Sequence, residues 1–270
     1  MINNYTQLQN ELNKLLYQIL KTHIRDLIKN VAAVRSAHDP EAIHDLRVTT
    51  RRLCEAIKIF NKVIPIESKD IQKKLKNLFH VLGKKRDLDV FSAFIRAKVD
   101  KLPVRLNHRT DEAQKHIISV IHSRSYANFV ILLEKLANEK MIKNKDILKQ
   151  TLLRFQRVLK KIQKLASSID SDANDKTLHK LRIAIKKLRY LCEFFEPFFN
   201  KNICTFSSLI NQLKGIQDIL GDHQDAITGL SMLSDYKKQL SAKEFEKIKK
   251  KYELKKKKTC KLFINAWQRG

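Results

Sequence analysis

The chain has 270 residues, 43% of them hydrophobic, which is enough for a sizeable core in one large domain or two ordinary ones. Its 55 Lys and Arg against 28 Asp and Glu give a formal charge of +27, far more than solubility requires and typical of proteins with polyanionic partners. With only 5 Gly and 4 Pro the chain does not favour a turn-rich fold, and four cysteines without CxxC spacing exclude the usual zinc and disulfide frameworks. We expect neither a metal nor a cofactor.

The N-terminal sequence MINNYTQLQNELNKLL has no basic stretch followed by an apolar core, so we expect no signal peptide. No apolar run approaches the roughly 20 residues that a membrane-spanning helix needs. We therefore expect a cytoplasmic protein without membrane insertion.

Apolar residues recur with a 3.6-residue period along nearly the whole chain, which predicts an all-α fold. The first helix is predicted over 5–36. The second begins at HDPEAIH, where Asp39 can cap the helix and Pro40 fits its first turn, and it stops before Pro65. Further helices are predicted over 67–82, 87–101, 110–141 with a bend near HSRSY, 145–167, 175–199, 203–220, 223–239 and 243–266.

One basic, histidine-bearing segment occurs twice. AIHDLRVTTRRLCEAIKIF starts at residue 42, and TLHKLRIAIKKLRYLCEFF starts at residue 177. At a constant offset of 135 residues, His44 pairs with His179 and Arg47 with Arg182. Such register indicates an internal duplication. It predicts a single domain over 1–270 made of two related helical halves, 1–140 and 141–270.

A second repeated motif follows each basic segment. LGKKRD ends at Asp87 and LGDHQD ends at Asp225, at an offset of 138 residues. Gly83 and Gly221 predict helix breaks here, and each aspartate is then a candidate N-cap of the next helix. The alternative is that each carboxylate supports the basic motif by orienting one of its side chains. Arg86, beside the first aspartate, is a further candidate contact.

The basic residues form one stripe on each helix, bordering the apolar face. At 100° per residue, His44, Arg47, Arg51 and Lys58 fall within about 60° of one another. Arginine can hold two phosphate oxygens, lysine supplies a point charge, and a nearby polyanion favours protonated histidine. One such helix alone is usually an ordinary solvated surface, but a second copy in register favours anion binding. The second stripe consists of His179, Arg182 and Lys186, flanked by Lys187 and Arg189.

These motifs, IHDLRVTTRRL with LGKKRDLDV and LHKLRIAIKKLRY with LKGIQDILGDHQD, resemble the CHAD domain, the conserved histidine α-helical domain, over essentially the whole chain. The resemblance implies two pseudo-symmetric antiparallel bundles of the four-helix type packed around a basic groove or pore. It also implies binding of inorganic polyphosphate, location at polyphosphate granules, and association with polyphosphate-metabolising enzymes. The contacts it implies are His44, Arg47, Arg51, Arg52, His179, Arg182, Lys186, Lys187 and Arg189.

Cys54 departs from the family pattern. The first motif usually continues with arginine at this place, as the second motif does at Arg189. The first stripe therefore has one cation fewer, and we expect it to contribute less to binding than the second.

Two other classes of function were compared with polyphosphate binding. A triphosphatase of the CYTH type needs an ExExK strand, whereas EFEKIKK from Glu244 is misregistered and predicted helical, and no Walker A loop is present. We therefore expect a non-catalytic binding module. Non-specific nucleic-acid binding remains the alternative because phosphate contacts alone supply it. It is less favoured because most phenylalanines lie on apolar faces, not on base-stacking surfaces.

Overall fold

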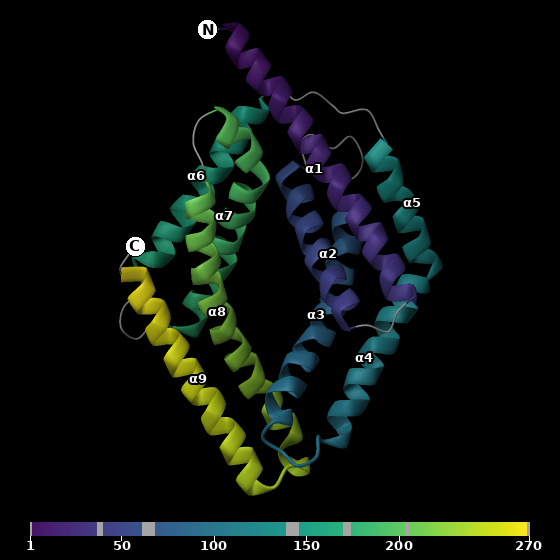
Figure 1. Ribbon diagram of the computed structural model, residues 1–270, viewed down its shortest axis with the longest axis vertical. Helices are drawn as coiled ribbons and strands as arrows, with labels where there is room; N and C mark the ends of the chain where they lie inside the picture. Colours follow the sequence, from purple (N-terminus) through teal and green to yellow (C-terminus); the bar gives the residue numbers. More distant parts are fainter. Residues whose placement is uncertain are drawn as a thin grey trace. The chain divides into compact units, whose positions relative to one another are not determined.

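The structure, a computed structural model, describes residues 2–36, 40–60, 68–138, 146–169, 174–202 and 206–268. Within these ranges every regular element is helical (Figure 1), so the predicted all-α class is confirmed. The predicted cap at Asp39 and the stop before Pro65 lie outside the described residues. The helices are α1 (Ile2–Ser36), α2 (Pro40–Phe60), α3 (Ser68–Arg96), α4 (Val104–His122), α5 (Arg124–Asn138), α6 (Ile147–Ala166), α7 (Asp175–Asn202), α8 (Ser207–Leu233), the short 3₁₀ helix η1 (Ser234–Gln239) and α9 (Ala242–Gln268).

The chain divides into two compact units that are not continuous in sequence. Unit 1 comprises residues 1–86 and 112–154, and unit 2 comprises 87–111 and 155–270. Helices α3, α4 and α6 each contribute to both units. The predicted halves, 1–140 and 141–270, describe the sequence duplication, and they and their pseudo-symmetry stay predictions.

In unit 1, α1 packs against α2 and α5. The apolar positions that gave α1 its helical period are the buried ones, including Leu12, Ile24 and Leu27, and those of α2 include Leu46 and Leu53. Burial of about ten such side chains, each contributing about 1.5 to 3 kcal/mol, holds the basic helix α2 in place. The charged side of α2 is thereby fixed relative to α1 and α3.

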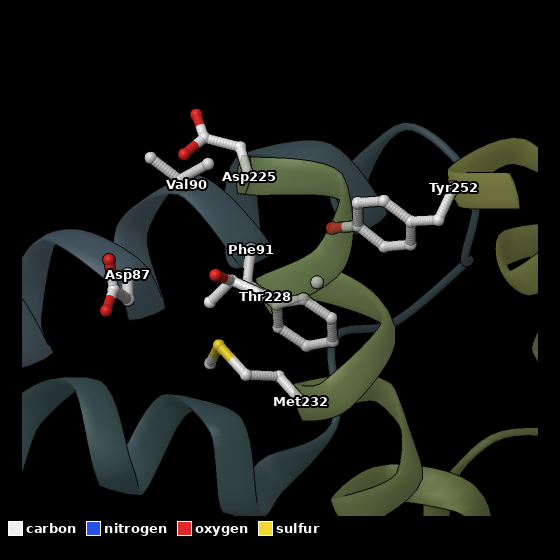
Figure 2. A pocket seen from close by; sticks show the side chains of 8 residues that line it. Asp87, Val90, Phe91, Asp225, Thr228, Met232 and Tyr252 are labelled. Carbon is white, nitrogen blue, oxygen red and sulfur yellow. The ribbon is translucent and has the colours of Figure 1, made fainter. Parts of the chain in front are cut away.

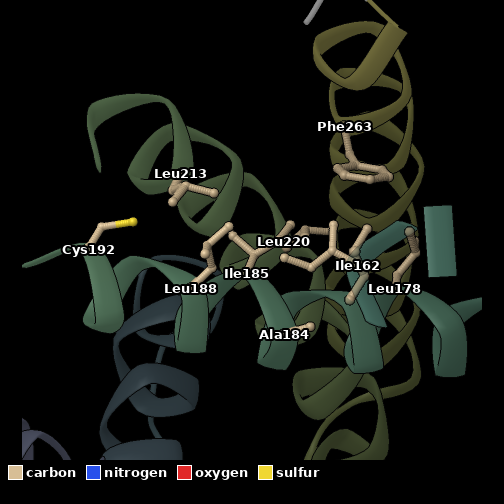
Figure 3. Close-up of a cluster of buried hydrophobic side chains, with 10 residues drawn as sticks. Ile162, Leu178, Ala184, Ile185, Leu188, Cys192, Leu213, Leu220 and Phe263 are labelled. Carbon is tan, nitrogen blue, oxygen red and sulfur yellow. The ribbon is translucent and has the colours of Figure 1, made fainter. Parts of the chain in front are cut away.

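In unit 2, α8 lies between α7 and α9 and packs against both. One cluster of buried side chains joins α6, α7, α8 and α9 (Figure 3). Its members come from the apolar faces of these helices: Ile162, Leu178, Leu181, Ala184, Ile185, Leu188, Cys192, Leu213, Leu220 and Phe263. The second basic helix, α7, is therefore anchored along its length by its apolar face.

The predicted helix breaks at Gly83 and Gly221 are wrong. Helix α3 runs through Gly83 and α8 runs through Gly221. A glycine inside a helix costs only about 1 kcal/mol relative to alanine, and the packing of a helix this long outweighs that cost. Asp87 and Asp225 consequently lie inside helices, so their interpretation as N-caps is also wrong.

Other helix ends agree better with the sequence. The bend predicted near HSRSY is a break at Ser123, which separates α4 from α5. The Ser123 hydroxyl accepts a hydrogen bond from the Tyr126 backbone N–H at 3.1 Å and so caps α5. Helix α4 begins at Val104, directly after Pro103, and not at residue 110 as predicted.

Candidate anion-binding site

The first basic stripe lies on α2 over an aromatic ring of α3. The guanidinium carbons of Arg47 and Arg51 lie 5.7 Å and 4.8 Å from the centre of the Phe79 ring. Both arginines and His44 are half-buried, and the Nε atom of Arg47 is fully buried. The ring supports both guanidinium groups by cation–π contact, which holds their polar ends in a restricted position at the surface.

Three other predicted residues of unit 1 have surroundings of their own. Arg52 is close enough to α1 that its charge, after the larger effect of burial, helps to lower the pKa of His23. The Lys58 ammonium lies 2.8 Å from the carboxylate of Glu55 on the same helix. Arg86 is exposed on α3, two turns after Phe79.

Cys54 replaces an arginine in the first stripe and is half-buried. Burial raises the pKa of its thiol to about 11. The side chain is therefore a neutral thiol at physiological pH and supplies no charge of either sign to α2. The first stripe therefore lacks a positive charge at this position, but it does not gain a negative one.

The second stripe lies on α7 and faces α8. The Arg182 guanidinium lies beside Gly221: a Cβ on this glycine would be 3.9 Å from one of the terminal guanidinium nitrogens. The Nε atom of Arg182 is fully buried, like that of Arg47. His179 is exposed, and its Nδ1 lies 2.6 Å from the Gln224 side-chain oxygen. Lys186 is half-buried and Lys187 is exposed. The residues of the duplicated motif thus project from a helix whose opposite face is core.

Arg189 is held by acceptors of its own unit. Its Nε donates to the Gln217 side-chain oxygen at 3.0 Å, and one terminal nitrogen lies 2.7 Å from the carboxylate of Glu193. At the 138-residue offset, Gln217 corresponds to Phe79, just as Arg189 corresponds to Cys54 at 135. The hydrogen-bonded pair Arg189 and Gln217 of the second half therefore corresponds to Cys54 and Phe79 of the first half.

The sequence interpretation missed the residues that support the two stripes. In unit 2 these are Gln217, Gly221 and Gln224, which follow the i, i+4, i+7 spacing of one helix face. In unit 1 it is Phe79, which the sequence interpretation did not single out from the other phenylalanines. The spacing within IQDILGDHQ was a visible signal, but the predicted break at Gly221 concealed it by assigning these residues to two helices.

Asp87 and Asp225 line a small pocket in unit 2 (Figure 2). The pocket is formed by α3, α8 and α9, and the Tyr252 ring from α9 closes one side. Burial, and secondarily the charge of Asp225, raises the pKa of Tyr252. The role of the two aspartates in orienting a basic side chain stays a prediction. The remaining lining residues are Val90, Phe91, Thr228, Gly229 and Met232.

His223 belongs to a buried polar network and not to the exposed stripe. Its side chain is 3% exposed, and Nε2 lies 3.1 Å from a carboxylate oxygen of Asp175 in the first turn of α7. The second oxygen of Asp175 lies 2.5 Å from the Lys256 ammonium of α9, and His223 Nδ1 lies 3.2 Å from the Thr259 hydroxyl. Partial burial alone would raise the pKa of Asp175, but hydrogen bonds from Lys256 and His223 outweigh it and lower the pKa.

Replacing Asp175 with asparagine is expected to lower the free energy of unfolding by about 1 to 2 kcal/mol at pH 7, because buried His223 loses a charged acceptor. Asp175 is 38% exposed, so solvent screening keeps the loss at this level. A carboxylate with a lowered pKa in the folded state stabilises above its unfolded pKa, near 4, and loses this contribution as the pH falls through the folded value. Urea unfolding should therefore show a smaller cost at about pH 3.

The matched control for this change is Asp222→Asn. The Asp222 carboxylate pairs with Lys255 at 2.8 Å but is 57% exposed. Loss of such a surface pair is expected to cost at most about 0.5 kcal/mol. Equal costs for the two variants would contradict a stabilising role of the Asp175 network.

Comparison with known proteins agrees with the fold and the motifs. The sequence model of the family described as the CHAD domain matches residues 18–234. The chain belongs to the CHAD-domain family. Helix α9, at Ala242–Gln268, lies beyond the matched segment of this CHAD protein.

Two solved structures are similar to this CHAD protein. The crystal structure of the CHAD domain from the plant Ricinus communis has 22% sequence identity and a TM-score of 0.74, and the match covers 95% of this chain and 91% of that one. PptA from Streptomyces chartreusis has 13% identity and a TM-score of 0.72, with 95% and 99% covered. At these identities the likeness shows the fold alone. A search of curated proteins found no match.

A helix that crosses a lipid bilayer needs about 20 predominantly apolar residues. Among the residues that the structure describes, none of the helices combines the length and apolar character needed to cross a membrane.

Proposed function

We propose that this CHAD protein binds inorganic polyphosphate through the stripes on α2 and α7 and acts as a non-catalytic binding module. The proposal combines the family's association with polyphosphate and the chemistry of the two stripes. We expect one polymer chain to contact both stripes, as the family resemblance implies. A cytoplasmic location, at polyphosphate granules, and association with polyphosphate-metabolising enzymes belong to the same proposal.

The observation that carries the proposal is the matched state of Arg47 and Arg182. These residues are paired by the 135-residue offset, and each buries its Nε atom. Each guanidinium also lies close to a residue of the following motif helix, that of Arg47 to the Phe79 ring and that of Arg182 to Gly221. A guanidinium group that is partly buried in this way loses less conformational entropy when it binds a phosphate oxygen. Ordinary solvated arginines have no need of such support.

Nucleic-acid binding is the second candidate, because a charge of +27 attracts any phosphate polymer. Proteins that bind single strands add exposed aromatic rings on which bases stack. Among the large hydrophobic side chains exposed in the described ranges, Tyr5 is the single aromatic one. Polyphosphate requires cations alone, so the composition of the stripes favours it.

Competition between polymers tests this choice. We expect long-chain polyphosphate to displace double-stranded DNA of equal total charge from the protein, with at least about tenfold higher affinity, corresponding to about 1.4 kcal/mol. The affinity should fall steeply with salt, because binding releases counterions from the polymer. Fluorescence anisotropy at two or more salt concentrations measures both quantities. DNA binding that equals or exceeds polyphosphate binding would overturn the proposal in favour of nucleic acid.

A further inference from the structure

The side chain of Gln224 on α8 contacts both the imidazole of His179 and the hydroxyl of Thr228. The Gln224 side-chain oxygen lies 2.6 Å from His179 Nδ1, and the Gln224 side-chain nitrogen lies 3.5 Å from the Thr228 hydroxyl one turn later. An amide oxygen can only accept a hydrogen bond, so this arrangement requires a proton on Nδ1.

We propose that Gln224 is a positioning residue that holds a proton on Nδ1 of His179 and leaves Nε2 to face the bound anion. The inference deepens the proposed function and rests on it for the identity of the ligand. With Nδ1 protonated, a neutral imidazole presents the lone pair of Nε2 to a phosphate oxygen, and two acceptors repel each other. The imidazolium form instead presents a second N–H. His179 therefore contributes to anion binding only after it takes up a proton.

The consequence is a coupling between anion binding and pH. Histidine side chains in general exchange a proton between about pH 5 and pH 8, so an anion contact that needs the imidazolium form is gained as the pH falls through this range. Binding of a polyanion draws a proton onto the ring, and by linkage the affinity decreases as the pH rises. Without Gln224 the neutral ring is able to carry its proton on Nε2 and to donate to phosphate uncharged.

The two halves of the chain differ at this position. At the 138-residue offset Gln224 corresponds to Arg86. An arginine has no hydrogen-bond acceptor, so it cannot hold a proton on Nδ1 of a histidine. The residue of the first half that corresponds to Gln224 therefore cannot play the same part for His44.

Charged groups on three helices surround this corner of unit 2. On α7, Asp175 lies one turn before His179 in sequence and Arg182 lies one turn after it. The Asp175 carboxylate already accepts from His223 of α8 and Lys256 of α9. The other titratable groups next to Gln224 in sequence are Asp222, which is paired with Lys255, and Asp225, which lines the pocket of Figure 2.

The tautomer can be measured without any ligand. In protein labelled with ¹⁵N in histidine, the imidazole nitrogen shifts of His179 at about pH 8.5 should report a proton on Nδ1 in the wild type. Gln224→Leu should shift the population toward the Nε2-protonated form, whereas Gln212→Leu, an exposed glutamine elsewhere on α8, should not. A wild-type ring protonated on Nε2 would overturn the inference whatever the protein binds.

The pH dependence of polyphosphate binding supplies the second test. We expect the affinity of the wild type to fall between pH 6 and pH 8, and the affinity of Gln224→Leu to fall less. The two decreases should differ by a factor of about five, which corresponds to one net hydrogen bond of about 1 kcal/mol. Gln224→Glu should favour the imidazolium and hold the affinity at pH 8 near its value at pH 6. In a His179→Asn background, changes at Gln224 should have no effect on the pH profile.

The outcomes of the two tests are distinct. If the wild type does not bind polyphosphate at either pH, the proposed function fails while the tautomer result still decides the role of Gln224. If Gln224→Leu and the wild type have the same pH profile, the positioning role is wrong. Should Gln224→Leu fail to fold, Gln224→Glu provides the same comparison through its opposite effect at pH 8.

Discussion

Replacing Arg182 and Lys186 together with glutamine is expected to weaken polyphosphate binding by about 10- to 100-fold. A hydrogen bond to a charged group contributes about 1.5 to 3 kcal/mol, and each 1.4 kcal/mol is a tenfold change in affinity. The Arg182 guanidinium lies beside Gly221 of α8 and its Nε atom is fully buried, so the group is held in place before the polymer arrives. Glutamine keeps much of the side-chain length and removes the charge. Isothermal titration with polyphosphate measures the effect.

The corresponding double replacement in the first stripe, Arg47 and Arg51 to glutamine, should also lower the affinity at least about tenfold. Here the loss includes the support that both guanidinium groups receive from Phe79. Because Cys54 supplies no cation, we expect the first stripe to be the weaker of the two. The difference between the double variants measures that asymmetry.

The matched control removes two exposed lysines of α9, Lys257 and Lys258. These side chains add to the overall field but belong to neither stripe, so their replacement by glutamine should lower the affinity by about threefold or less. All three double variants lose the same formal charge. A larger loss in the α9 variant than in either stripe variant would show that the stripes are not the binding site.

Replacing Gly229 with alanine is expected to destabilise the protein by about 2 to 3 kcal/mol. A Cβ at this buried position of α8 would overlap the Tyr252 ring and lie 2.7 Å from its hydroxyl oxygen. The ring stacks on Phe94 and Phe91 of α3, with centroids 3.8 Å and 6.3 Å away, so it has little room to move. Overpacking a core position costs typically about 1 to 3 kcal/mol. Chemical unfolding measures the loss.

Gly215→Ala is the control on the same helix. Apart from the backbone of its own helix turn and its chain neighbours, nothing lies within 4 Å of the place that its Cβ would occupy. The change should stabilise α8 by about 0.5 to 1 kcal/mol, because alanine has the higher helix propensity. In a Tyr252→Ala background, the cost of Gly229→Ala should largely disappear. Destabilisation by both alanines alike would assign the effect to the helix backbone and not to the aromatic ring.

The local features of this protein were predictable because they depend on residues close together in sequence. A 3.6-residue apolar period is sufficient to predict helices such as α6 and α7, since the same apolar positions face the core. The break at Ser123 followed from a polar segment with its own capping hydroxyl. The helix breaks at Gly83 and Gly221 were predicted wrongly because the penalty of a glycine is local, whereas the packing that overrides it comes from other helices.

The helical class, the duplicated motif and the position of each cationic stripe beside an apolar face could all be predicted from the amino-acid sequence. These properties follow from periodicity and register, which need no knowledge of neighbours. The contacts of the stripe residues became known only from the packed helices: Phe79 contacts Arg47 and Arg51, Gln224 contacts His179, and Gln217 contacts Arg189. His179 and Gln224 are 45 residues apart in sequence, and Arg189 and Gln217 are 28 residues apart. Only the packing of one helix on the next brings such residues into contact.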